Sequence, residues 1–204
     1  MKIRSTEAMC IGAAFCAALA LAVGVLAVRG VDESGVRAAL ATTARLVFLL
    51  FWPAYSGSAL AALFGSPFQQ LRRHAREFGL AFVSALSVHL GLVGLLCLIG
   101  AAPSRDTFIF FGGAAACAYL LALFSIPKLH AALGAKYWRA LNFVGMNYLA
   151  YAFIVDFVKL PLGGSVAHVA EYLPFAFLSL AGPSLRLAAF VKRAGQSRAL
   201  WSSR

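Results

Sequence analysis

The sequence has little charge, and acidic residues are especially scarce. Asp and Glu together number 7 in 204 residues, against 18 Lys and Arg, and charged residues make up only 12% of the chain. Hydrophobic residues make up 62% of it, and the mean hydropathy is +0.84. A chain this apolar has too little polar surface to cover a water-soluble globule. The composition therefore predicts an integral membrane protein.

Cysteine is also scarce, and its positions show no spacing typical of metal or redox sites. The four cysteines all lie inside apolar runs, without a CxxC pair or a Cys/His motif: Cys10, Cys16, Cys97 and Cys117. Cysteines in such surroundings act as small packing residues. We expect neither a disulfide framework nor a zinc site.

The net charge of +11 does not indicate a nucleic-acid partner. Basic residues fall between the apolar runs, whereas a nucleic-acid surface clusters them and interleaves them with exposed aromatic residues. Internal repeats are also absent. A transporter built from two repeated halves is therefore disfavoured.

Six apolar runs are long enough to cross a hydrocarbon core of about 30 Å as helices. They cover roughly residues 8–28, 38–64, 78–100, 107–126, 138–160 and 170–191. The connections are too short for a soluble domain, so we predict an all-α fold in which residues 1–204 form a single six-helix transmembrane domain. The first run is longer than the roughly 7–15 apolar residues of a signal peptide, which favours an uncleaved helix.

Two runs contain residues that predict how their helices pack. Pro53 predicts a kink in the second helix, with its freed backbone groups satisfied by hydroxyls or neighbouring helices. Gly112, Gly113 and the alanines that follow allow another helix to approach the fourth closely. We therefore expect the fourth helix to be central in the bundle.

The basic residues in the connections predict the orientation of the chain. Twelve of them fall on one side of the six spans: Lys2, Arg4, Arg72, Arg73, Arg76, Lys128, Lys136, Arg139, Lys192, Arg193, Arg198 and Arg204. Four fall on the other: Arg29, Arg37, Arg105 and Lys159. Positively charged connections stay inside, so both termini are predicted to be cytoplasmic. We expect the membrane to be the inner membrane of a bacterium.

His89 lies about midway along the third apolar run, where ionisable residues are costly and normally face the bundle interior. A neutral imidazole there is either a hydrogen-bonded packing residue or an axial ligand for haem iron. A six-coordinate b haem needs a second, facing histidine. The other three lie in connections: His74, His130 and His168.

Arg45 and Asp156 are predicted to lie at similar depth near the outer side. An ion pair between them would fix the packing of the second and fifth helices. Alternatively, each side chain reaches the interface separately, or the two bind an anion, a quinone headgroup or a haem propionate.

Amides and phenols gather in the fifth helix, at Asn142, Asn147, Tyr148 and Tyr151. Asn142 and Asp156 lie near the same helical face, since 14 residues make almost four turns. Hydrogen bonds between helices are the expected role of the asparagines.

Three segments together resemble the ferric-reductase-like transmembrane domain family, which includes the haem-binding membrane subunit of bacterial methionine sulfoxide reductase systems. The first is Thr43-Ala44-Arg45 followed by LVFLLFWPA. The second runs from Arg72-Arg73 through Phe78-Gly79-Leu80 to His89, and the third holds Leu133-Gly134, Trp138, Leu141 and Gly145. The resemblance covers roughly residues 38–160. It implies a six-helix fold and a haem ligand at His89.

The chain departs from the family pattern at the ligand that should face His89. Asn142 stands where the pattern places a histidine after W-x-x-L, and Val155-Asp156 stands where many members carry a further ligand. An amide is a poor ligand for haem iron, so only His89 is a candidate cofactor ligand.

Two functions follow from this partial resemblance. In the first, the protein is a haem-poor or haem-free member of the family that acts as a membrane partner or scaffold subunit, or binds a small molecule. In the second, it is an oxidoreductase subunit with one b-type haem on His89. That subunit would transfer electrons across the membrane, from a cytoplasmic or quinone donor to a separate redox partner, because the chain has no flavin or nicotinamide domain of its own.

Overall fold

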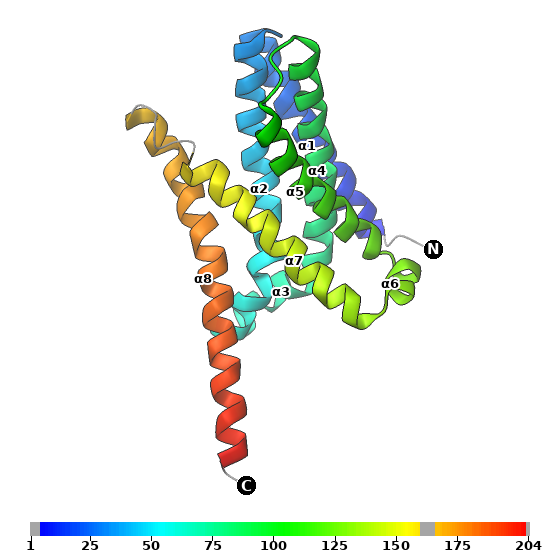
Figure 1. The fold of residues 1–204 in the computed structure, drawn as a ribbon, viewed down its shortest axis with the longest axis vertical. Coiled ribbons are helices and arrows are strands. Elements are labelled where there is room, and N and C mark those ends of the chain that lie inside the picture. The colour runs from blue at the N-terminus through cyan, green and yellow to red at the C-terminus, as the bar shows by residue number, and fades with distance from the viewer. Residues whose placement is uncertain (1–4, 160–165, 203–204) are drawn as a thin grey trace.

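The computed structural model describes the backbone of residues 5–159 and 166–202, and the side chains of residues 7–158 and 169–196. This part of the chain is helical between short connections and contains no strand. Its long helices are α1 (Ser5–Arg29), α2 (Glu33–Phe64), α4 (Ala75–Leu98), α5 (Arg105–Phe124), α7 (Ala135–Ile154) and α8 (Val166–Ser202). These six are long and apolar enough to cross a membrane, which confirms the all-α fold and the integral membrane protein (Figure 1).

Polar caps start α2 and α5 before their apolar runs begin. The Asp32 carboxylate accepts a hydrogen bond from the Gly35 N–H at 2.8 Å and begins α2 at Glu33. This bond also lowers the pKa of Asp32 below its usual value. Ser104 caps α5 in the same way through the Thr107 N–H. Such caps satisfy amide groups that a helix start leaves without partners.

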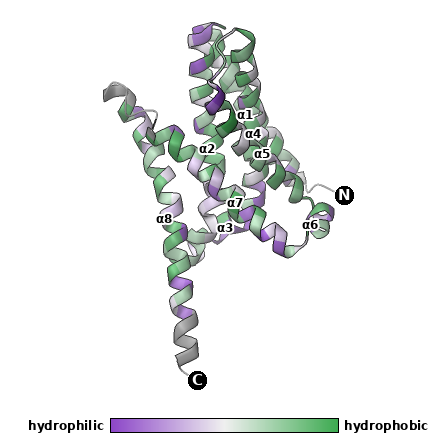
Figure 2. Ribbon diagram, viewed as in Figure 1, coloured by the Kyte–Doolittle hydropathy of each residue, from purple (hydrophilic) through white to green (hydrophobic). Residues whose placement is uncertain are grey.

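Short helices fill two connections that the apolar pattern left without structure. The 3₁₀ turn η1 (Ser66–Phe68) and α3 (Gln69–Arg73) join α2 to α4, and α6 (Pro127–Leu133) joins α5 to α7. α7 continues into the π-helical turn η2 (Val155–Lys159). Figure 2 shows more hydrophilic residues gathered around α6 and the first turns of α7.

The central helix is α2, so the expectation that the fourth span would be central is wrong. α2 contacts α1, α4, α7 and α8. α5, the fourth span, packs mainly on α7, and only Ala114 and Ala118 are buried along it. Its small residues differ in their surroundings, because Gly112 and Ala115 line a cavity, whereas Gly113 lies close to the Tyr148 side chain of α7.

Small residues do bring α1 close to α2 and α4. Ala14, Ala18 and Ala22 are buried and recur every four residues, so they share one face of α1. The Ser84 hydroxyl on α4 donates to the Ile11 carbonyl of α1 at 2.9 Å. α1, α2 and α4 therefore form a tightly packed group, in the way small residues allow in membrane helices.

Aromatic side chains join α2 to α7, η2 and α8. Phe48 is 1% exposed and its ring centroid lies 5.1 Å from that of Phe153 and 5.0 Å from that of Phe157. Phe175 of α8 packs on Phe157 at 5.4 Å. These contacts hold the end of α7 and the start of α8 against the middle of α2. Offset aromatic contacts at such distances are favourable beyond the area they bury.

Two polar contacts identify helix ends that lie on the same side of the bundle. Arg76 at the start of α4 forms a 2.6 Å ion pair with Glu7 at the start of α1. The Lys192 ammonium group of α8 donates to the carbonyls of Ala62 and Leu63 at the end of α2. This is the side predicted to be cytoplasmic. Several basic residues of that prediction lie outside the described side chains: Lys2, Arg4, Lys159, Arg198 and Arg204.

Pro53 does not break α2, which continues through it to Phe64. The Ser56 hydroxyl donates to the Trp52 carbonyl. A proline removes the hydrogen bond to the carbonyl four residues earlier, which here is that of Leu49. The hydroxyl therefore satisfies a neighbouring carbonyl and not the one that Pro53 frees.

Candidate functional site

His89 on α4 is held by a hydrogen bond from one side of its ring. Its Nδ1 atom lies 2.9 Å from the hydroxyl oxygen of Thr43 on α2. Thr43 is fully buried, and its hydroxyl also lies within hydrogen-bond distance of the Ala39 and Leu40 carbonyls of its own helix. In the sequence, Thr43 was notable only as part of a segment that resembles the ferric-reductase-like family. Its contact with His89 depends on the packing of α2 against α4.

The single proton of the Thr43 hydroxyl constrains the tautomer of His89. When that proton is donated to the Ala39 or Leu40 carbonyl, the hydroxyl oxygen can only accept from Nδ1–H of a neutral imidazole. The second nitrogen, Nε2, then carries the lone pair. A fixed tautomer with Nε2 free to accept a hydrogen bond or bind a metal is the arrangement that outer hydrogen bonds give to ligating histidines.

His89 lines a cavity of about 480 Å³ between α2, α4, α5, α7 and α8. Most of the lining is apolar, and it includes the rings of Phe108, Phe111 and Phe153. A mainly apolar cavity with a few polar groups is typical of sites for small molecules. We call it the His89 cavity.

Asp156 lines the same cavity. It belongs to the π-helical turn η2, where the backbone departs from the regular α7 helix. Among the described residues, no hydrogen bond or ion pair involves its carboxyl group. π-Helical turns often occur at functional sites, and an ionisable residue in a membrane helix points to the same interpretation. The sequence identified both polar residues but did not place them on one cavity.

The predicted ion pair between Arg45 and Asp156 is wrong. The Arg45 guanidinium instead pairs with Glu171 of α8, with 2.7 Å between Nη1 and Oε1. The same guanidinium lies over the rings of Tyr172 and Phe175, 4.8 and 5.7 Å from their centroids. Glu171 comes at the start of the sixth span, one helix later than the expected partner, because α8 and not η2 covers this face of α2.

The polar residues of α7 do not form one cluster with His89. The Tyr148 hydroxyl donates to the Phe110 carbonyl of α5 at 2.8 Å. Asn147 accepts from the Tyr55 hydroxyl of α2 at 2.9 Å. Both bonds join helices, which is the role expected of the asparagines and is confirmed for Asn147. Among the described residues, Asn142 makes no such bond.

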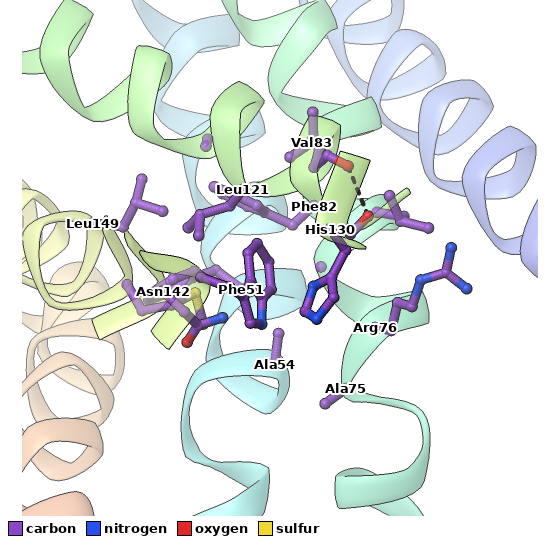
Figure 3. A pocket seen from close by; sticks show the side chains of 17 residues that line it. Phe51, Ala54, Ala75, Arg76, Phe82, Val83, Leu121, His130, Asn142 and Leu149 are labelled. Carbon is purple, nitrogen blue, oxygen red and sulfur yellow. Dashed lines mark hydrogen bonds between the residues drawn. The ribbon is translucent and has the colours of Figure 1, made fainter. Parts of the chain in front are cut away.

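Asn142 lines a different cavity, of about 390 Å³, bounded by α2, α4, α5, α6 and α7. We call it the Asn142 cavity (Figure 3). Of the other histidines, His130 lines this second cavity and His74 contacts Glu77 at 3.6 Å. His168 lies outside the described side chains.

These placements do not fit a six-coordinate haem. His89 is the one histidine among the described residues that line its cavity, and the α7 residues on that cavity are Leu149, Ala152 and Phe153. The Asn142 cavity likewise has one histidine among its described lining residues, His130. In the described part of the chain, no group of three or more His, Cys, Asp or Glu side chains is arranged to hold a metal ion. The described site supplies one axial ligand at most.

Compared with known proteins, the chain matches no family model, no curated protein and no solved structure. The resemblance to the ferric-reductase-like family therefore stays a prediction from the residues. The function has to be inferred from the two cavities.

A polar group that the sequence pattern did not indicate lies between α2 and α8. The Arg186 guanidinium lies over the Tyr55 ring, 4.4 Å from its centroid, and the Tyr55 hydroxyl continues to Asn147. A basic residue inside the last apolar run was the available signal. The close contact of Gly182 with Tyr55 brings the two helices together here.

Proposed function

We propose that this protein is a haem-free membrane subunit, of ferric-reductase-like architecture, that binds a lipid-soluble molecule in the His89 cavity. The observation that carries the proposal is the pairing of two polar groups, His89 and Asp156, on one otherwise apolar cavity. A molecule held there could serve a separate membrane or redox partner, so the protein would act as a binding or scaffold subunit.

A quinone is the ligand class that best matches the lining. Its flat apolar ring suits a cavity with several aromatic side chains, among them Phe108, Phe111 and Phe153. The two carbonyl oxygens of a quinone need hydrogen-bond donors. The two hydroxyls of its reduced form, the quinol, need acceptors. A neutral imidazole whose Nδ1 is engaged by Thr43 offers Nε2 as an acceptor, and a protonated Asp156 carboxyl would offer a donor.

The absence of a facing ligand supports a haem-free protein over the six-coordinate haem of the family. The α7 positions on the His89 cavity carry no histidine. Asn142, the residue at the family's ligand position, lines the other cavity.

One observation favours a second candidate, a b-type haem bound by His89 alone. The Thr43 hydroxyl holds Nδ1 at 2.9 Å, and ligating histidines commonly have such an outer hydrogen bond. A haem would give the site redox activity. In that case the residues His89 and Thr43 would supply the axial nitrogen and its orientation.

Two measurements on the detergent-purified protein distinguish these functions. The first is an absorption spectrum before and after dithionite reduction. We expect no b-type band from protein produced in haem-replete cells. A sharp reduced band that disappears in His89→Ala would reject the haem-free proposal and support the second candidate.

The second measurement is the affinity for decyl-ubiquinone, a short-chain quinone. Quenching of tryptophan fluorescence reports the binding. We expect Asp156→Leu to weaken binding of the quinone about tenfold, and His89→Leu to weaken binding of its reduced form, decyl-ubiquinol, about tenfold, the usual effect of losing one buried hydrogen bond to a ligand. His130→Leu, in the other cavity, is the matched control and should bind as the unmodified protein does. Equal affinity in all four proteins would contradict a quinone site at His89.

A further inference from the structure

The Asn142 cavity is polar toward one membrane side and apolar in its depth. Arg76, His130 and Asn142 come from the start of α4, from α6 and from the early turns of α7. Phe82 and Val83 on α4 and Met146 on α7 line the cavity further from these helix starts, toward the bundle centre. In Figure 3, Asn142 and His130 lie on either side of Phe51, the Arg76 side chain extends to the right of them, and Val83 and Leu121 lie above in that view. The cavity thus has the polarity of a lipid molecule, with a polar head region and an apolar interior.

The three polar side chains are positioned by the fold but retain free hydrogen-bonding capacity. Arg76 uses Nη1 to pair with Glu7 at 2.6 Å, and a guanidinium has five N–H donors. His130 packs edge-on against the Trp138 ring, with 5.0 Å between centroids. The Asn142 side chain has no hydrogen-bond partner within the described part of the chain. The site therefore offers several donors in a fixed arrangement.

The charge around this cavity favours an anion. The adjoining connections carry Arg72, Arg73, Lys128, Lys136 and Arg139. Of the described acidic side chains near it, Glu7 is paired with Arg76 at 2.6 Å, and Glu77 lies 3.6 Å from the His74 ring. Basic pockets between membrane helices are known to bind anionic lipid headgroups.

We propose that the Asn142 cavity binds an anionic amphiphile from the membrane, a molecule with a phosphate diester or carboxylate head on an acyl chain. The head would accept hydrogen bonds from Arg76, His130 and the Asn142 amide. The chain would lie along Phe82, Val83 and Met146. The volume of about 390 Å³ falls within the roughly 300–1,000 Å³ typical of small-molecule sites, and an acyl chain can extend beyond it into the bilayer. This site is independent of the proposed function at His89.

The test is native mass spectrometry of the full chain in detergent, with phosphatidylglycerol, oleate or phosphatidylcholine added at equal concentration. We expect phosphatidylglycerol or oleate to bind about tenfold more tightly than phosphatidylcholine, the gain of a charge-assisted contact. The preferred anion identifies the source of the head, phosphate or carboxylate. Equal binding of all three lipids would overturn the proposal.

The variants keep the test independent of folding defects. Arg76→Gln alone would leave Glu7 buried without its partner, so the substitution is made in a Glu7→Gln background and compared with Glu7→Gln alone. We expect the double variant and Asn142→Leu each to lose about tenfold in affinity for the preferred anion. Arg73→Gln removes one charge outside the cavity and should change affinity less than twofold. An equal loss in Arg73→Gln would show general charge attraction and overturn the site.

Discussion

Thr43 and His89 illustrate how one hydroxyl can decide the chemistry of a membrane histidine. The imidazole lies on a span where an unpaired polar group is costly, and Thr43 is its hydrogen-bond partner at 2.9 Å. Thr42, the preceding residue, donates only to the Ala38 carbonyl of its own helix. The two threonines therefore differ in one contact between helices.

Replacing Thr43 with valine is expected to destabilise the protein relative to Thr42→Val. Valine keeps the shape of threonine but leaves His89 Nδ1 without its partner, so we expect Thr43→Val to be less stable by about 1 kcal/mol. Denaturant unfolding of both variants in detergent measures the difference. Equal stability of the two variants would show that the hydroxyl does not hold the imidazole.

At the scale of elements, α5 depends on α7 for most of its packing. The Tyr148 hydroxyl of α7 reaches the Phe110 carbonyl of α5, and it passes directly over Gly113. A Cβ atom added at Gly113 would lie 2.9 Å from that hydroxyl oxygen, whereas one added at Gly112 would meet nothing within 4 Å. A methyl side chain at position 113 would therefore clash with Tyr148, whereas one at position 112 would meet no other residue.

Gly113→Ala should destabilise the contact between α5 and α7, and Gly112→Ala should not. Both changes gain the same helix propensity, so their difference isolates the steric effect of the added methyl group. We expect Gly113→Ala to be about 1–3 kcal/mol less stable than Gly112→Ala, as for other overpacked sites. Thermal unfolding in detergent would measure it. The interpretation fails if Gly113→Ala is the more stable variant.

For the whole molecule, the helices form two groups with cavities between them. α1, α2 and α4 pack closely, and α5 packs with α7. Both cavities are lined by residues from each group, and Phe82 and Leu149 line both of them. The space for ligands is therefore a consequence of how the α5 and α7 pair stands against α2 and α4 (Figure 1).

The six spans predict which connections a membrane-impermeant thiol reagent can reach. In a cysteine-free background, Gln70→Cys lies between α2 and α4, and Ala102→Cys lies between α4 and α5. We expect intact cells to be labelled at Ala102→Cys alone, and inside-out vesicles at Gln70→Cys alone, because α4 separates the two positions. Labelling of both positions from one side would contradict α4 as a span. The reverse pattern would leave the six spans intact but show that the predicted orientation is wrong.

Hydropathy by itself determined the architecture. Apolar runs of membrane length must satisfy their backbone groups internally, and helices are the way a single segment can do so. The six spans, and the presence of the ionisable residues His89 and Asp156 within them, were therefore accessible from the sequence. Helix starts were less so, since Asp32 and Ser104 extend α2 and α5 beyond their apolar runs.

Only the tertiary structure decided which polar residues meet. Arg45 pairs with Glu171 and not with Asp156, and His89 and Asn142 line separate cavities. The physical reason is that hydropathy constrains the depth of a residue along a span, whereas partners depend on which helices are neighbours and how each is rotated. In a membrane, which helices are neighbours and how each is rotated depend on side-chain packing between helices. That packing cannot be deduced from any one of the six apolar runs by itself.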